Sequence, residues 1–179
     1  MHEIETKILE VEASGIAMKL SILGAEKIQD VMLTVDWFSL AGVSKDDNPW
    51  FLRIRSYSTG KIEVTWKAKS EMLGVSRRHK EINVIVDNHE QMKNLFEEIG
   101  LVLYAHQEKN RISWQLDGVQ FDLDTYPGMQ SYLEIEAGSE DEIQEMIKKL
   151  DLSSHETWND GERTLIENKY KLNWSNMRF

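Results

Sequence analysis

Charged and apolar residues alternate along several stretches of this chain in the pattern of a β-strand. From Glu3 to Lys7, the charged residues Glu3, Glu5 and Lys7 are two positions apart, so an extended strand places them on one face. The alternation recurs at Arg53/Arg55, Lys61 to Lys69, Arg111, Asp122/Asp124 and Glu134/Glu136. Strands with charge on one face and apolar residues on the other predict a closed sheet with a charged interior and a helix-covered exterior.

The whole pattern predicts about eight strands, most of them joined by short polar turns. We expect strands at residues 2–11, 27–38, 50–57, 61–69, 80–86, 101–107, 111–116, 119–126 and 132–137. Three segments have the composition of turns, namely Ser58-Thr59-Gly60, Glu108-Lys109-Asn110 and Asp117-Gly118. Residues 41–49 are polar and predict a longer loop.

Four segments have helical spacing instead. Ser14 precedes a predicted helix over Ile16–Leu23, and Asp87 or Asn88 can cap a helix that runs to about Gly100. Ser139 and Glu142 form a capping-box pattern before a third helix, and a last helix is expected over residues 161–172. The predicted fold class is therefore α+β, an eight-stranded antiparallel β-barrel with flanking α-helices. No repeat or linker divides the chain, so we expect one domain over residues 1–179.

Composition and charge narrow the classes of function. The chain has 179 residues, 41% of them hydrophobic, and a formal net charge of −10, which argues against a broad nucleic-acid-binding surface. Because it contains no cysteine, disulfides, thiolate metal sites and cysteine nucleophiles are excluded. No apolar run is long enough to span a membrane, and the N-terminus lacks a signal-peptide pattern. We expect a cytoplasmic protein without membrane or nucleic-acid partners.

The alternating charges predict a metal and phosphate site inside the barrel. Carboxylates at Glu3, Glu5, Glu134 and Glu136 are hard oxygen ligands, which suit Mg²⁺ or Mn²⁺ better than zinc. The basic candidates are the guanidinium forks of Arg53, Arg55 and Arg111 and the ammonium groups of Lys7, Lys67 and Lys69. Acids beside bases predict a small ligand that carries several phosphates.

Several motifs resemble those of the CYTH domains, or triphosphate tunnel metalloenzymes. Glu3-Ile4-Glu5-Thr6-Lys7 is similar to the family's ExExK signature, Leu52-Arg53-Ile54-Arg55 to its LRxR strand, and Val64-Thr65-Trp66-Lys67 to its T-x-K strand. Glu81 resembles a mid-chain acidic position, Arg111 a phosphate-binding arginine and Asp124 a late aspartate, while Tyr132-Leu133-Glu134-Ile135-Glu136 resembles the closing E-x-E strand. The order of the motifs matches as well, and the likeness covers nearly the whole chain.

The resemblance implies an eight-stranded tunnel that holds a linear triphosphate. It implies metal ligation by Glu3, Glu5, Asp124, Glu134 and Glu136, with Glu5, Lys7 and Asp124 in catalytic roles. Class IV adenylyl cyclases are the members most similar in length and motif layout, and triphosphate hydrolysis is the alternative activity. A third possibility is a non-catalytic polyphosphate-binding module. Residues 125–131 depart from the turn that cyclase-like members carry before the closing strand.

Other readings of the same residues stay open. Lys61, Glu63 and Lys69 could form a solvated strand face, and Asp122 could belong to a turn or rim. The apolar pairs Trp37-Phe38 and Trp50-Phe51 are compatible with a homodimer or with burial inside the monomer.

Overall fold

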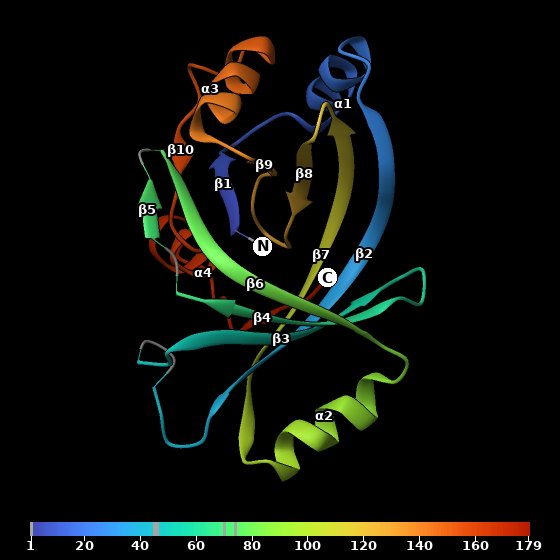
Figure 1. Cartoon of the computed structure of the whole chain (residues 1–179), viewed down its shortest axis with the longest axis vertical. Coiled ribbons are helices and arrows are strands. Elements are labelled where there is room, and N and C mark those ends of the chain that lie inside the picture. Colours follow the sequence, from blue (N-terminus) through green and yellow to red (C-terminus); the bar gives the residue numbers. More distant parts are fainter. Residues whose placement is uncertain (1, 45–46, 70, 74) are drawn as a thin grey trace.

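The computed structural model describes residues 2–44, 47–69, 71–73 and 75–179, and in this part of the chain eight antiparallel strands surround a tunnel (Figure 1). In spatial order they are β1 (His2–Ile8), β9 (Tyr132–Ala137), β8 (Val119–Thr125), β7 (Leu101–Leu116), β2 (Glu26–Leu40), β3 (Trp50–Tyr57), β4 (Ile62–Ala68) and β6 (Ser76–Val86). β1 pairs with β9 on one side and with β6 on the other, which brings the two ends of this path together. The predicted α+β fold with an antiparallel, barrel-like tunnel is confirmed.

The alternation in β1 separates the tunnel from the hydrophobic core, as predicted. Glu5 and Lys7 face the cavity inside the tunnel. The neighbouring Ile4 and Ile8 point the other way and pack into the core beneath the helices. Because side chains alternate along a strand, one segment supplies both the charged interior and the apolar exterior.

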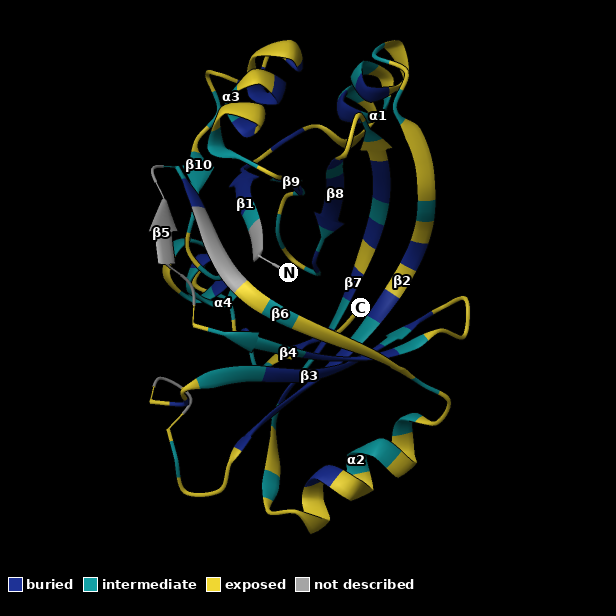
Figure 2. Ribbon diagram, in the orientation of Figure 1, coloured by how far each residue is buried: buried dark blue, intermediate teal, exposed yellow. Residues whose placement is uncertain are grey.

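Three helices cover the outside of the sheet. α1 (Ala13–Ile22) and α3 (Glu140–Lys149) pack over one end, and α2 (His89–Glu98) packs over the other (Figure 1). Phe96 of α2 meets Phe38 of β2 with ring centroids 5.1 Å apart. The helix faces turned toward the sheet are buried or half-buried, with Phe96 as the buried residue of α2, and the opposite faces are mostly exposed (Figure 2). Among the helices in the described ranges, none is long and apolar enough to cross a membrane.

The N-cap residues predicted from the sequence are correct for two of the three helices α1, α2 and α3. Asn88 caps α2 by accepting from the Gln91 N–H at 2.9 Å, and Ser139 caps α3. The prediction for α1 was wrong, because the cap is Glu12, whose carboxylate accepts from the backbone N–H groups of Ser14 and Gly15. A glutamate reaches these donors as an aspartate or serine would, so α1 begins three residues earlier than expected, at Ala13.

The turn predicted at residues 108–110 does not exist, because β7 runs without interruption from Leu101 to Leu116. β2 pairs with it from Glu26↔Gln115 to Leu40↔Leu101, with register shifts at Lys27/Gln29 and Trp37/Phe38. The polar residues that resembled a turn belong to a strand whose inner face is charged. The Lys109 side chain therefore points into the tunnel and lines its cavity. By contrast, Asp117 and Gly118 do form a tight turn, with φ of 50° and 86°.

The single helix predicted over residues 161–172 was also wrong. The structure has a three-residue helix, α4 (Glu162–Thr164), followed by a π-helical turn, η1 (Leu165–Lys169). Leu165 and Ile166 bury themselves against the inner faces of β2 and β7. The chain then adds the short strand β11 (Asn176–Met177) parallel to β7. Two other short strands, β5 (Glu71–Leu73) and β10 (Thr157–Trp158), pair with β6 and β1 respectively.

Candidate functional site

The tunnel encloses a cavity of about 430 Å³ whose wall is mostly charged or aromatic. Its basic side chains are Lys7, Arg53, Arg55, Lys61, Lys67, Lys109, Arg111 and Arg163, and its acidic side chains are Glu5, Glu63, Glu81, Asp122, Glu134, Glu136 and Glu162. Most of the site residues that the sequence predicts therefore line one cavity. Lys69 lies just after the end of β4 and is exposed, and it is not part of this wall. The side chain of Glu3 lies outside the described part of the structure.

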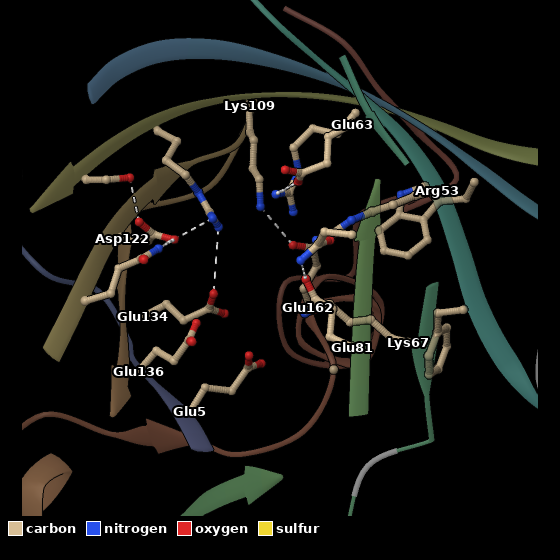
Figure 3. Close-up of a pocket in the computed structure, with 18 of the residues that line it drawn as sticks. Glu5, Arg53, Glu63, Lys67, Glu81, Lys109, Asp122, Glu134, Glu136 and Glu162 are labelled. Carbon is tan, nitrogen blue, oxygen red and sulfur yellow. Dashed lines mark hydrogen bonds and ion pairs between the residues drawn. The ribbon is translucent and has the colours of Figure 1, made fainter. Parts of the chain in front are cut away.

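The acidic side of the cavity is built by β1 and β9. Glu5 pairs directly with Glu136 across these strands, and Lys7 pairs with Glu134. The Lys7 Nζ lies 2.8 Å from Glu134 Oε2 and 3.5 Å from Glu5 Oε1. The carboxylates of Glu5, Glu134 and Glu136 point into the same part of the tunnel (Figure 3). Burial raises the pKa of Glu134, but the charges of Lys7 and Arg111 together hold this pKa below its ordinary value.

These carboxylates have the right chemistry for Mg²⁺ or Mn²⁺. No three His, Asp or Glu side chains among the described residues form a group that could hold a metal ion alone. Mg²⁺ usually binds one or two carboxylates together with substrate phosphates and water, rather than a cage made by protein alone. The donor set of Glu5, Glu134 and Glu136 therefore fits a metal ion whose coordination water or a phosphate ligand would complete.

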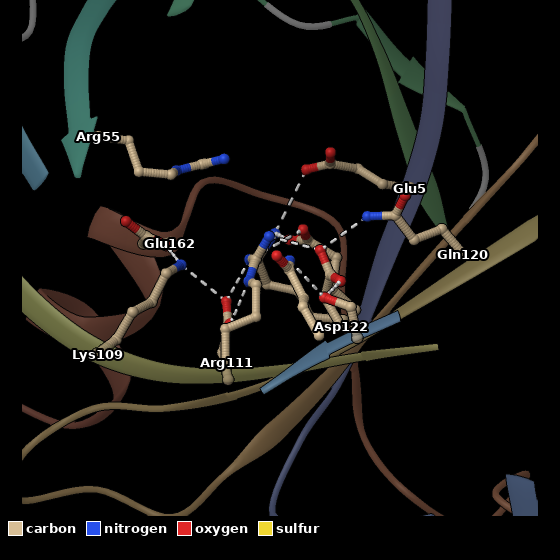
Figure 4. Close-up of polar contacts among 12 residues, drawn as sticks. Glu5, Arg55, Lys109, Arg111, Gln120, Asp122 and Glu162 are labelled. Carbon is tan, nitrogen blue, oxygen red and sulfur yellow. Dashed lines mark hydrogen bonds and ion pairs between the residues drawn. The ribbon is translucent and has the colours of Figure 1, made fainter. Parts of the chain in front are cut away.

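Arg111 is held in a fork of two aspartates (Figure 4). Its Nε and Nη2 donate to the two carboxylate oxygens of Asp124, both at 2.6 Å, and its Nη1 donates to Asp122 at 2.5 Å. Asp122 also accepts from Ser113 and Gln120, so it belongs to the inner wall and not to a rim. These carboxylates outweigh burial and raise the pKa of Arg111 well above its ordinary value.

Asp124 lies behind Arg111 and not on the cavity wall. It is fully buried, and besides Arg111 it accepts from Lys109 Nζ at 2.7 Å and from the Tyr132 hydroxyl at 3.0 Å. Burial raises the pKa of Asp124, but Arg111 and Lys109 together hold it well below the ordinary range. Its metal-binding and catalytic roles stay predictions, whereas its contacts are those of a residue that fixes two bases.

Lys109 and Glu162 are site residues that sequence reasoning missed. Lys109 was assigned to a turn, yet its alternation with Arg111 and Ser113 along β7 is the signal that could have found it. Glu162 comes from α4 and accepts from Lys109 Nζ at 3.1 Å and from the Tyr132 hydroxyl at 3.3 Å. No local pattern marks Glu162, since only the path of the C-terminal segment brings it into the tunnel.

The opposite wall carries Arg53 and Arg55 on β3. Arg53 lies over the ring of Trp37 at 5.3 Å, and Arg55 Nη1 lies 3.4 Å from Glu63 Oε1. In the described structure the Nε of each arginine is buried without a hydrogen-bond partner. Burial and the charge of Arg55 lower the pKa of Arg53, although an arginine stays protonated in proteins. Buried guanidinium groups with unused donors are suited to an anionic ligand.

Two further bases, Lys67 and Lys61, are paired with acids at the edge of this wall. Lys67 forms an ion pair with Glu81 across β4 and β6, and Lys61 Nζ lies 2.8 Å from Glu63 Oε2. A solvated strand face was an alternative for Lys61 and Glu63. Glu63 is buried, whereas Lys61 lines the cavity but is exposed.

Comparisons with known proteins agree with this architecture. A model of the CYTH domain matches residues 1–162. A Methanocaldococcus jannaschii protein provisionally named an adenylate cyclase is 24% identical over 164 residues, which cover 86% of this chain and 91% of that protein.

Solved structures show the same fold at low identity. A Vibrio parahaemolyticus protein provisionally named an adenylate cyclase has a TM-score of 0.76 at 11% identity, covering 93% of this chain and 98% of that one. A Hippeastrum protein, provisionally named an adenylyl cyclase and reported to have a dominant triphosphatase activity, has a TM-score of 0.67 at 13% identity, covering 94% and 95%.

Proposed function

The chain belongs to the CYTH domain family, and on this premise we propose that it is a divalent-metal-dependent enzyme acting on the triphosphate group of a small molecule. The preferred reaction is that of a class IV adenylyl cyclase, which converts ATP to cyclic AMP and pyrophosphate. Hydrolysis of an inorganic, nucleoside or thiamine triphosphate is the second candidate. The structural likeness to the Hippeastrum protein favours this second candidate, because the reported activity of that protein is mainly that of a triphosphatase.

One observation carries the proposal: a single cavity presents carboxylates on one wall and buried guanidinium groups with unused donors on the other. Arg53 and Arg55 offer such donors, while Glu5 and Glu134 supply oxygen ligands. A phosphate chain can bridge the two walls, since its oxygens accept hydrogen bonds from arginine and also coordinate metal. The tunnel thereby selects a linear, multiply charged ligand.

The charge of the cavity supports a requirement for metal. Among the described residues, eight basic and seven acidic side chains line it, so this part of the wall is nearly neutral. A triphosphate carries several negative charges, and Glu5, Glu134 and Glu136 would repel them. Mg²⁺ or Mn²⁺ held by these carboxylates would neutralise the acidic wall and stabilise charge that develops on the phosphates. We expect weak triphosphate binding without a divalent ion.

The side chains of this protein would act mainly by positioning the phosphates. Arg53, Arg55 and Arg111 would hold phosphate oxygens, with Lys7, Lys67 and Lys109 adding positive charge. Asp124 would act through Arg111 and Lys109 by fixing their positions. In the cyclase reaction the ribose 3′-hydroxyl loses its proton and attacks the α-phosphorus, and the bond to the β-phosphate breaks to release pyrophosphate. In hydrolysis, water attacks the terminal phosphorus and orthophosphate is released.

Phosphorus NMR of the purified protein tests the proposal. The protein is given ATP and inorganic triphosphate separately, with Mg²⁺ or Mn²⁺, and every phosphorus product is identified. Cyclic AMP with pyrophosphate is the expected result, and release of orthophosphate would instead establish a triphosphatase. Binding without any turnover would overturn the enzyme proposal in favour of a non-catalytic binding module.

A further inference from the structure

Glu162 places a carboxylate among the bases that face the cavity. Its Oε2 lies 3.1 Å from the Nζ of Lys109, and its side chain is 14% exposed toward the cavity. An acid in this position occupies the kind of site that a phosphate oxygen would take, because Lys109 can donate to either.

The carboxylate is ionised at neutral pH. Burial raises the pKa of Glu162, but Lys109 and the surrounding hydrogen bonds lower it to about 2. A group with so low a pKa is a weak general base, since an efficient base has a pKa near the working pH. The role open to Glu162 is electrostatic.

Lys109 does not need Glu162 to be neutralised. Its Nζ also donates to Asp124 Oδ2 at 2.7 Å, and it lies 5.0 Å from the centre of the Tyr126 ring. Moving the Glu162 carboxylate away would therefore leave Lys109 buried but still paired, with donors free for a phosphate oxygen.

The backbone around Glu162 is anchored independently of its carboxylate. The Gly161 carbonyl accepts from Trp158 Nε1 at 3.3 Å and from Thr164 Oγ1 at 2.7 Å. The side chain can thus turn within the cavity while α4 keeps its place.

We propose that Glu162 is an internal anion that competes with the triphosphate for Lys109, and so sets how tightly the tunnel holds its substrate. This inference rests on the proposed function. Glu162 then controls the affinity for the substrate. The C-terminal segment, which carries Glu162, thereby adjusts how tightly the tunnel binds the triphosphate. A triphosphate that enters the cavity displaces the carboxylate from Lys109.

Isothermal titration calorimetry with inorganic triphosphate and Mg²⁺ tests the inference on the full chain. Glu162→Gln keeps the shape but removes the charge, and we expect it to bind the triphosphate about tenfold more tightly. Glu145→Gln is the matched control, because Glu145 is an exposed acid of α3 outside the tunnel, paired with Lys149 at 2.7 Å, and the affinity of this variant should equal that of the wild type. If Glu162→Gln folds poorly, Glu162→Asp keeps the charge but shortens the side chain, and we expect a smaller gain in affinity.

The outcomes separate this inference from the proposed function. Equal or weaker binding by folded Glu162→Gln, with the wild type binding normally, would overturn the inference alone and make Glu162 a residue that positions Lys109. Absence of triphosphate binding in the wild type and in both variants, with Mg²⁺ and with Mn²⁺, would overturn the proposed function and the inference with it. In turnover, the expected signature is a lower KM for Glu162→Gln, with kcat changed far less.

Discussion

The guanidinium of Arg111 binds the carboxylate of Asp124 through two parallel hydrogen bonds, each 2.6 Å long. This is the bidentate geometry that makes arginine–carboxylate pairs strong and specific in direction. Asp124 is fully buried, and Lys109 donates to the same carboxylate. One buried aspartate thus orients two bases of the tunnel.

Replacing Asp124 should mainly lower the stability of the folded protein. Asp124→Ala leaves Arg111 and Lys109 without their main counter-charge in a buried position, and we expect the free energy of unfolding to fall by about 3–5 kcal/mol. Urea unfolding followed by tryptophan fluorescence measures this change. Asp124→Asn keeps the shape, and a variant with wild-type stability but lost Mg²⁺ affinity would show that Asp124 is a metal ligand instead.

Lys109→Met should weaken the binding of inorganic triphosphate by about tenfold or more, because it removes a buried positive charge from the cavity wall. Arg111 continues to neutralise Asp124, so the fold should persist. Calorimetric titration gives the affinity, and Lys148→Met on the exposed face of α3 is the control for loss of one positive charge. Unchanged affinity in Lys109→Met would remove Lys109 from the phosphate-binding set.

The strands could be predicted from the sequence because a barrel with a charged interior imposes a period of two. Glu5 and Lys7 on one side of β1 and Ile4 and Ile8 on the other are visible without any structure. The same rule failed at Lys109. There, three consecutive polar residues in the middle of a 16-residue strand matched the composition of a turn. Pairing with the long strand β2, from Glu26 to Leu40, keeps β7 extended through these residues.

The candidate site was predictable where motifs lie on strands and not where it depends on tertiary contacts. Arg53 and Arg111 follow from their strand faces. Whether Asp124 lines the cavity or supports Arg111 depends on how deeply β8 is packed, which spacing does not encode. Glu162 reaches the tunnel because Leu165 and Ile166 anchor the C-terminal segment inside it, far along the chain from the motifs.

Glu134→Gln and Glu5→Gln should each lower metal-dependent turnover at least about 100-fold while the fold is retained. Each variant removes one carboxylate from the acidic wall, and Lys7 keeps the other as a partner. Turnover is measured as a function of Mg²⁺ concentration, with Glu145→Gln as the control outside the tunnel. Wild-type turnover in both variants would show that these acids are not the metal site.

Another buried aspartate, Asp36, lies on the outer wall of the tunnel and joins α2 to the sheet. Its two carboxylate oxygens accept from His89 Nε2 at 2.9 Å and from His106 Nδ1 at 2.6 Å. His89 Nδ1 in turn lies 2.8 Å from the hydroxyl of Ser56. This network ties the first residue of α2 to β2, β3 and β7.

The Asp36 network should make stability depend on pH. Burial raises the pKa of Asp36, but the hydrogen bonds from His89 and His106 outweigh burial and hold it below its ordinary value. A lowered pKa stabilises the folded state above the unfolded value of about 3.9, and this stabilisation is lost as the pH falls through the folded value. At pH 7, Asp36→Asn should lower the free energy of unfolding by about 1–3 kcal/mol. The difference from the wild type should shrink below about pH 4.

Urea unfolding of both proteins at several pH values between 7 and 3 checks this expectation. Asp151→Asn is the control, because the Asp151 side chain is 98% exposed and its removal should change stability little at any pH. A difference between wild type and Asp36→Asn that stays constant down to low pH would mean that Asp36 contributes packing and not charge. In that case α2 would be held on the sheet mainly by the contact between Phe96 and Phe38, and Phe96→Ala would then be the variant that releases it.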